Sequence, residues 1–245
     1  MFFHFASFFF SLIFFAGMEL VAFYPRMFFY ALFLLPFVAF WANRRISCKN
    51  YFSIIPVVFS VSSVLLLYLI DTGIEKQIFI VASSFMQYIT FLSECRLKRY
   101  KMDQTAKGLM AASLMTTLFF FYTSTYGVYL NFAISLWILM MVFLVVTFLV
   151  SYQYLKIINS EKLAVWRYSI IMGLIMAEIS WVVNFWPFGY LTTGAILLMF
   201  YYIIWDMVQS YFLNLLSKKR VVANMVLFGF LIGFILFSSR WLPNV

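Results

Sequence analysis

Three carboxyl groups lie inside long apolar stretches of this sequence, where a charged side chain is rare. They are Glu19, Glu178 and Asp206, and no Lys or Arg lies in the middle of those stretches to pair with them. In a membrane, such a charge costs roughly 2.5–3.5 kcal/mol and usually faces a bundle interior or a water-filled cavity. A carboxyl group in an apolar environment also takes up a proton more readily than one in water. We therefore expect these acids to form a proton or cation path.

Polar side chains accompany two of the acids at helical spacing. Tyr202, Asp206 and Gln209 follow an i, i+4, i+7 pattern, which places them on one side of a helix. Asn184 follows Glu178 by about two helical turns and precedes a Pro-Phe-Gly turn, so we expect it at the outer mouth of the path. The sequence thus predicts six residues of a substrate or proton path.

A second polar stripe consists of Ser83, Gln87, Thr90 and Glu94 at the same helical spacing. In lipid, a stripe of this kind faces other helices. Polar side chains also hold helices together across a dry interface, at roughly 0.6–2 kcal/mol for each contact. For Ser83 and Thr90, packing is therefore a better explanation than ligand binding.

The composition requires an apolar environment around most of the chain. Of its 245 residues, 66% are hydrophobic and 10% are charged, whereas an ordinary soluble domain carries about 25% charged residues. The net charge of +9 does not indicate nucleic acid, because fourteen of the seventeen Lys and Arg residues lie in four short gaps beside apolar runs. Such clusters orient a protein in the lipid bilayer and contact anionic lipid headgroups.

The apolar runs predict an all-α fold, a polytopic integral membrane bundle of about nine transmembrane helices. A crossing needs about 20 apolar residues, and Pro25 with Arg26 divides the first long run. A minimal turn is expected at Tyr129–Asn131. If the short second span and the first form one broken crossing, the count is eight. The expected spans are residues 2–24, 27–42, 51–70, 77–93, 108–128, 132–154, 168–186, 191–213 and 221–237.

The charge pattern also predicts an orientation. The four basic gaps follow spans two, four, six and eight, and the opposite side holds only Arg26, Lys76 and Arg240. Basic loops stay in the cytoplasm, so we expect a cytoplasmic N-terminus and a cytoplasmic (inner or plasma) membrane location. No loop exceeds about a dozen residues on this span assignment, which predicts a single transmembrane domain over residues 1–245 without an extramembrane domain.

Depth within the membrane differs among the three acids. Measured from the outer ends of their expected spans, Glu19 lies about 8 Å deep, Glu178 about 13 Å and Asp206 about 22 Å. The acids would form a descending series if the first, seventh and eighth spans were neighbours.

The residues that build common catalytic and metal sites are scarce. The chain has one histidine, His4, and two cysteines, Cys48 and Cys95. It contains no P-loop, GxGxxG, HExxH or GxSxG pattern. We therefore expect no catalytic residues, no metal and no cofactor, and the sequence favours a protein that is not an enzyme.

Three functions fit these observations. The first is a small proton- or cation-coupled transporter, in which Glu178 and Asp206 bind the ion. The second is a non-catalytic scaffold or subunit of a larger membrane complex, in which the carboxyl groups pair with basic residues of a membrane protein partner. The third is an intramembrane lipid-modifying enzyme, ranked last because the acids lie toward the outer leaflet and centre whereas the basic residues lie inside.

Overall fold

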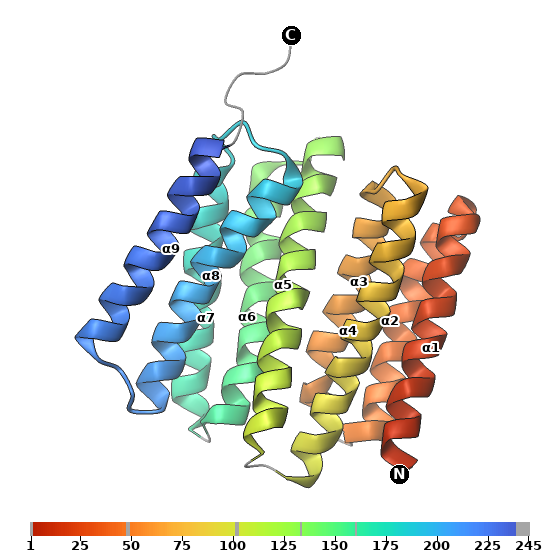
Figure 1. Ribbon diagram of the computed structural model, residues 1–245, viewed down its shortest axis with the longest axis horizontal. Helices are drawn as coiled ribbons and strands as arrows, with labels where there is room; N and C mark the ends of the chain where they lie inside the picture. Colours follow the sequence, from red (N-terminus) through yellow and green to blue (C-terminus); the bar gives the residue numbers. More distant parts are fainter. Residues whose placement is uncertain (1, 48–49, 101–102, 133, 160, 239–245) are drawn as a thin grey trace. The chain divides into compact units, whose positions relative to one another are not determined.

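The computed structural model describes residues 2–47, 50–100, 103–132, 134–159 and 161–238. Within these residues there are nine α-helices and no β-strand (Figure 1), so the predicted all-α fold is confirmed. Cys48, Lys49, Lys101 and Arg240 lie outside the described residues. The helices are α1 Phe2–Phe23, α2 Phe28–Ser47, α3 Ile54–Leu69, α4 Gly73–Arg99, α5 Gln104–Phe132, α6 Leu136–Ile158, α7 Lys162–Val183, α8 Tyr190–Phe212 and α9 Lys218–Ser238.

Several helices continue past the expected spans into the basic gaps. The clearest case is α4, which begins at Gly73 and ends at Arg99, although the apolar run covers only residues 77–93. Lys, Arg, Glu and Gln are good helix formers, so a helix does not end where its apolar run ends. For such helices the apolar length underestimates the helix, whereas α3, Ile54–Leu69, is shorter than its expected span of residues 51–70.

The turn between α5 and α6 differs from the prediction. Tyr129–Asn131 is helical, and α5 continues to Phe132. The side-chain amide of Asn131 donates a hydrogen bond of 2.8 Å to the carbonyl oxygen of Gly127, one turn earlier in the same helix. The chain then leaves the helix and reaches an extended residue, Ser135, directly before α6.

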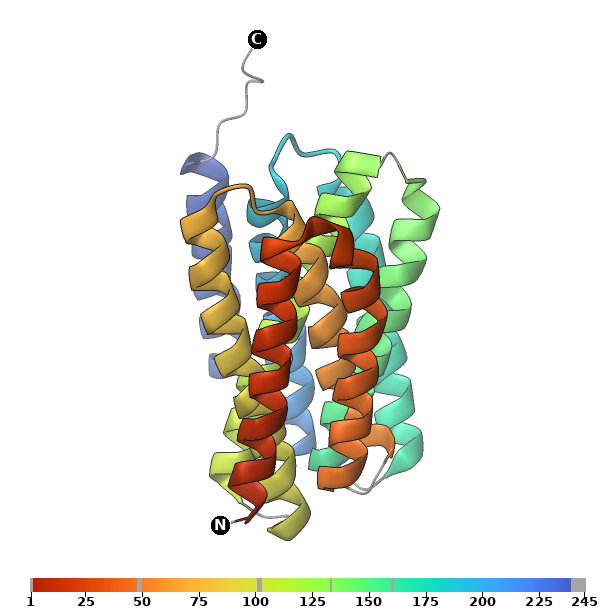
Figure 2. The ribbon, with the colours of Figure 1, turned by 90° about the vertical axis from the view of Figure 1, so that its right-hand side faces the viewer.

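The first long apolar run forms two helices. Between α1 and α2 lies a short 3₁₀ turn, Pro25–Met27, because proline fixes its own backbone angle and suits the first position of a new helix. The two helices pack side by side in opposite directions (Figure 2). With the turn included, the second apolar helix is 22 residues long. The structure therefore has two helices where the eight-span alternative has one broken crossing.

The described helices support the membrane assignment by length and composition. Six of them are long and apolar enough to cross a membrane: α1, α2, α4, α6, α7 and α8. The apolar part of α9 and the 16-residue α3 are shorter, and α5, with 29 residues, is long but does not reach the same hydropathy. These features indicate a membrane protein, and nine crossings stays a prediction.

The chain divides into two compact units, and the boundary lies within α5. Unit 1 is Met1–Ser124 and unit 2 is Thr125–Val245. In unit 1, α1 packs against α2 and α4, and α3 packs against α2 and α4. In unit 2, α6 packs most closely against α7, while α8 contacts α6, α7 and α9. Each unit is thus a helical assembly with its own interior.

A glycine permits the close approach of α6 and α7. A Cβ atom added at Gly173 would lie 2.8 Å from the carbonyl oxygen of Leu144 and 3.3 Å from Cβ of Phe148. Small residues allow helix backbones to approach in this way, and this close packing favours helix association in membranes.

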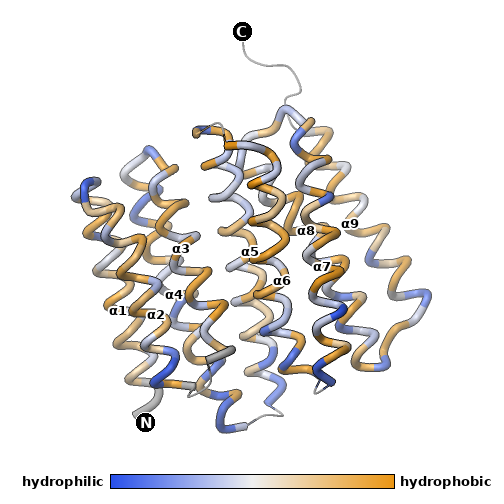
Figure 3. Tube along the Cα trace, turned by 180° about the vertical axis from the view of Figure 1, so that it is seen from behind, coloured by the Kyte–Doolittle hydropathy of each residue, from blue (hydrophilic) through white to orange (hydrophobic). Residues whose placement is uncertain are grey.

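The basic gaps of unit 1 lie at one end of its helices. The ammonium group of Lys98, near the end of α4, donates a hydrogen bond of 3.0 Å to the carbonyl oxygen of Ile46, near the end of α2. Hydrophilic segments gather at these helix ends, whereas the helix middles are mostly apolar (Figure 3). The gaps that follow α2 and α4 therefore face the same side of unit 1.

Candidate functional site

Glu178 lies on the exposed side of α7. Leu174 and Trp181 lie on this side of α7, and Phe185 lies in the turn just after the helix; their exposed fractions are 46%, 48% and 68%. Glu178 itself is exposed and has no hydrogen-bond or ion-pair partner among the described residues. We call these four residues the outer face of α7. It is an apolar surface with one carboxyl group in it.

Glu178 lies near the end of α7. Because α7 ends at Val183, Glu178 lies five residues, or about 8 Å, from the end of its helix. Its carboxyl group therefore lies in the last two turns of the helix.

Asp206 has the opposite environment. It is only 6% exposed, and its Oδ2 atom accepts a hydrogen bond of 2.5 Å from the side-chain amide of Asn224 in α9. The ring of Tyr202, one turn earlier in α8, packs on Phe228 of α9 with 4.7 Å between ring centroids. Tyr202 and Asp206 thus both contact α9.

Gln209 and Asn184 bind to other helices of unit 2. The Oε1 atom of Gln209 accepts a hydrogen bond of 3.2 Å from the hydroxyl of Tyr154 in α6. Asn184 follows α7 directly, and its Oδ1 atom lies 3.5 Å from the hydroxyl of Tyr126, which donates to it. These hydrogen bonds connect Gln209 and Asn184 to other residues and not to one another or to the remaining predicted path residues.

Glu19 belongs to unit 1, whereas the other five predicted residues belong to unit 2. It is half-buried, and its Oε2 atom accepts a hydrogen bond of 3.1 Å from the side-chain amide of Gln77 in α4. Glu19 lies four residues, or about 6 Å, before the end of α1 at Phe23. Its bond to Gln77 joins α1 to α4 near this end.

The second polar stripe lies in the interior of unit 1. Ser83, Gln87, Thr90 and Glu94 are all 0% exposed. The side-chain amide of Gln87 donates to the hydroxyl oxygen of Ser60 in α3 over 3.4 Å. The stripe faces neighbouring helices, as its spacing indicates, and Gln87 contributes a polar contact between α3 and α4.

Asn224 and Tyr201 are two polar residues that sequence reasoning missed. Asn224 binds Asp206, and the hydroxyl of Tyr201 lies 3.0 Å from that of Ser151 in α6. A signal for Asn224 was present, because it is the only amide or charged residue in the apolar run 221–237. Tyr201 is fully buried but precedes a second tyrosine, and spacing alone does not tell which of the two points inward.

Asp103 precedes α5 and is the N-cap of that helix. One carboxylate oxygen accepts hydrogen bonds from the backbone N–H groups of Thr105, over 2.9 Å, and Ala106, over 3.3 Å. The other lies 3.2 Å from Nε of Arg96. Hydrogen bonding from the Thr105 side chain, with these backbone bonds and the Arg96 charge, lowers the pKa of the Asp103 carboxyl below its usual value.

No group of three or more His, Cys, Asp or Glu side chains within the described residues is arranged to hold a metal ion. The arrangement consists of one exposed acid, one buried acid bound to an amide, and several hydrogen bonds between helices. Chemically, it can provide a polar attachment point on α7 and a protonatable group between α8 and α9.

The helices are all α-helical, and six of them are long and apolar enough to cross a membrane, which indicates the class of helical membrane proteins. Within it, residues 41–238 match the family described as "Protein of unknown function (DUF5656)". The match covers more than half of the chain, which therefore belongs to this family. No curated protein and no solved structure matches the chain significantly. The matched region contains every predicted path residue except Glu19.

Proposed function

We propose that this protein is a non-catalytic subunit or scaffold of a membrane complex and binds another membrane protein through the outer face of α7. The observation that carries the proposal is the exposed carboxyl group of Glu178 among exposed Leu174, Trp181 and Phe185. A charge facing lipid costs up to roughly 2.5–3.5 kcal/mol at the centre of a span. A partner that supplies a hydrogen-bond donor reduces this cost.

The chemistry of Glu178 favours a partner helix with Lys, Arg or another strong donor at the same depth. A hydrogen bond to a charged group contributes about 1.5–3 kcal/mol, more than a typical neutral polar contact between membrane helices. A second copy of this chain fits less well. Identical surfaces meet in a twofold dimer, and two facing carboxyl groups disfavour each other's charged forms.

Site-specific photo-crosslinking in the native membrane tests this proposal. A photoreactive phenylalanine analogue replaces Trp181, which lies one turn from Glu178. The matched control replaces Trp137, which is 77% exposed on α6 and lies near the start of that helix. We expect a specific protein adduct from position 181 and none from position 137. The adduct should disappear when Glu178→Leu is added.

A charge exchange then identifies the contact. Glu178→Lys should abolish the adduct, and replacing the crosslinked partner's basic residue by glutamate should restore it. Equal adducts from positions 181 and 137, or an adduct unaffected by both Glu178 substitutions, would contradict the proposal. A dimer of this chain as the only adduct would do so too.

A second candidate function is a proton- or cation-coupled carrier, favoured by the buried carboxyl group of Asp206. It is 6% exposed and bonded to Asn224, and Tyr202 and Gln209 lie one turn before it and after it in α8. On this proposal, Asp206 takes up and releases the coupling ion. In the path predicted from the sequence, Asn184 lies at the outer mouth.

Charge movement in reconstituted membranes tests the carrier. Proteoliposomes adsorbed on a solid-supported membrane receive a pH step, and the transient current is recorded. We expect a current for the unmodified protein, a large loss for Asp206→Asn and little change for Glu178→Gln. The same current in Asp206→Asn, or no current from the folded unmodified protein, would contradict proton coupling through Asp206.

A further inference from the structure

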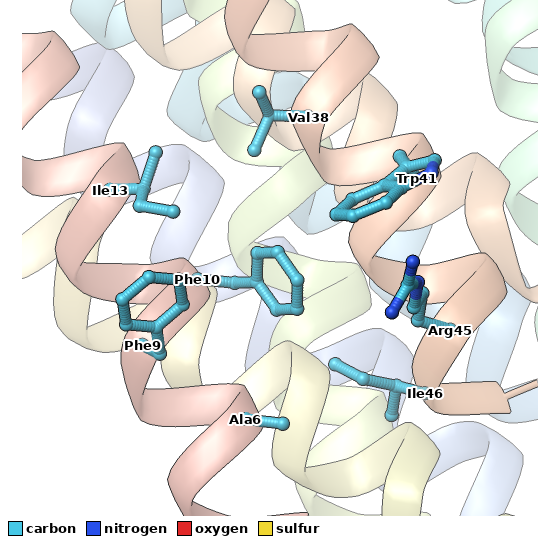
Figure 4. A pocket seen from close by; sticks show the side chains of 8 residues that line it. All are labelled: Ala6, Phe9, Phe10, Ile13, Val38, Trp41, Arg45 and Ile46. Carbon is cyan, nitrogen blue, oxygen red and sulfur yellow. The ribbon is translucent and has the colours of Figure 1, made fainter.

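A groove between α1 and α2 is hollowed into the surface of unit 1 (Figure 4). Its volume is about 550 Å³, within the roughly 300–1,000 Å³ typical of small-molecule sites. Phe9, Phe10 and Ile13 of α1 and Val38 and Trp41 of α2 line most of it. Phe9 and Trp41 are 52% and 46% exposed, so the groove opens to the outside of the unit.

One end of this groove is cationic. Arg45, in the last turn of α2, lines the groove with Cζ 4.4 Å from the ring centroid of Trp41. The side chain of Arg45 is exposed and has no carboxylate partner among the described residues. Lys98 adds a second positive charge at this end, where it bonds to the carbonyl oxygen of Ile46. An anionic group here would meet the guanidinium directly.

The groove runs from this basic end into the apolar part of the helices. Along α1 it extends from Ala6 to Ile13, and along α2 from Arg45 back to Val38. Seven residues of helix correspond to about 10 Å in each case. The length and polarity suit a molecule with an anionic head and a hydrocarbon chain.

We propose that this groove binds one phospholipid with an anionic headgroup, with its phosphate on Arg45 and an acyl chain between α1 and α2. Guanidinium groups bind phosphate through paired hydrogen bonds, and tryptophan rings favour the headgroup level of a bilayer. The site shares no residue with the partner surface on α7.

Native mass spectrometry of the full chain tests the site. The protein in mild detergent is titrated with phosphatidylglycerol and, separately, with phosphatidylcholine. We expect one tightly bound phosphatidylglycerol and no comparable binding of phosphatidylcholine. Arg45→Gln should weaken binding about fivefold, equivalent to about 1 kcal/mol for one basic residue at a membrane surface. Arg44→Gln, the matched control, removes an exposed adjacent charge that does not line the groove and should change the affinity less than twofold.

Two further experiments distinguish binding of the lipid headgroup from binding of its acyl chain. Ile13→Trp fills the apolar end and should abolish lipid binding, with helicity checked by circular dichroism. If that variant does not fold, the two arginine variants still decide the question. Glycerol phosphate at millimolar concentration should not displace the lipid. Equal binding of both lipids, equal losses in both arginine variants, or displacement by glycerol phosphate would overturn the proposal.

Discussion

Replacing Glu178 by leucine separates a docking role from a structural one. Glu178 is exposed and has no partner within the described residues, so the substitution removes no contact inside the chain. The side chain at position 178 still faces lipid when the helices separate within the membrane. The substitution therefore affects the folded and the unfolded state equally. We therefore expect the free energy of unfolding of the isolated chain to change by less than about 0.5 kcal/mol, as for other surface substitutions.

Association with the proposed partner should change far more. A hydrogen bond between Glu178 and a basic donor contributes about 1.5–3 kcal/mol. Its loss corresponds to an increase of about 10- to 150-fold in the dissociation constant. The effect on binding should thus be large although the effect on folding is small.

Asp206→Leu is the matched control, because Asp206 is a carboxyl group in the neighbouring helix that is buried and bonded to Asn224. Its loss removes the acceptor of the half-buried Asn224 amide, and leaving a polar group unpaired away from water costs about 1–3 kcal/mol of stability. Unfolding is measured in mixed micelles with increasing denaturing detergent, and association by fluorescence energy transfer in nanodiscs. If Glu178→Leu destabilises the chain as much as Asp206→Leu, or leaves association unchanged, the reasoning about the outer face of α7 is wrong.

Three further predictions concern the packing and charge of the helices. Tyr201→Phe should reduce the free energy of unfolding by about 0.5–1.5 kcal/mol, because it removes the hydroxyl that lies beside the Ser151 hydroxyl. Tyr202→Phe should have little effect. Equal effects of the two substitutions on unfolding in micelles would contradict this prediction. Gly173→Ala should destabilise the chain by about 1–3 kcal/mol, because its Cβ atom would meet backbone, whereas Gly229→Ala, with nothing within 4 Å, should not. Asp103→Ala should lower the melting temperature at neutral pH. The ordinary pKa of this carboxyl is 3.8, and its pKa in the folded state is lower, so the carboxyl stabilises the folded state only while it is ionised. The difference in melting temperature from the unmodified chain should therefore vanish as the pH falls below 3.8 and through the folded-state pKa. A difference that persists well below that range would show that the Asp103 charge is not responsible.

The positions of the helices could be predicted from the sequence because they depend on local properties. Each long apolar run satisfies its backbone hydrogen bonds within itself, and a proline such as Pro25 interrupts the run where it occurs. The polar stripe that contains Gln87 and Glu94 was predictable as well, since helical spacing alone puts it on one side, and that side is buried. The end of α5 was not, because no proline or glycine lies at Tyr129–Asn131 to end the helix, which continues to Phe132.

The environments of the two acids in unit 2 were decided only by the tertiary structure. Glu178 and Asp206 have the same sequence signature, a carboxyl group in an apolar run, yet one is exposed on α7 and the other is bonded to Asn224 of α9. In a soluble protein, the polar face of a helix marks its exposed side. In a membrane protein, lipid is as apolar as the interior, so hydropathy predicts that α7 and α8 cross but not which side of each helix meets a neighbour. That choice depends on how α6, α8 and α9 pack, which no local stretch of residues specifies.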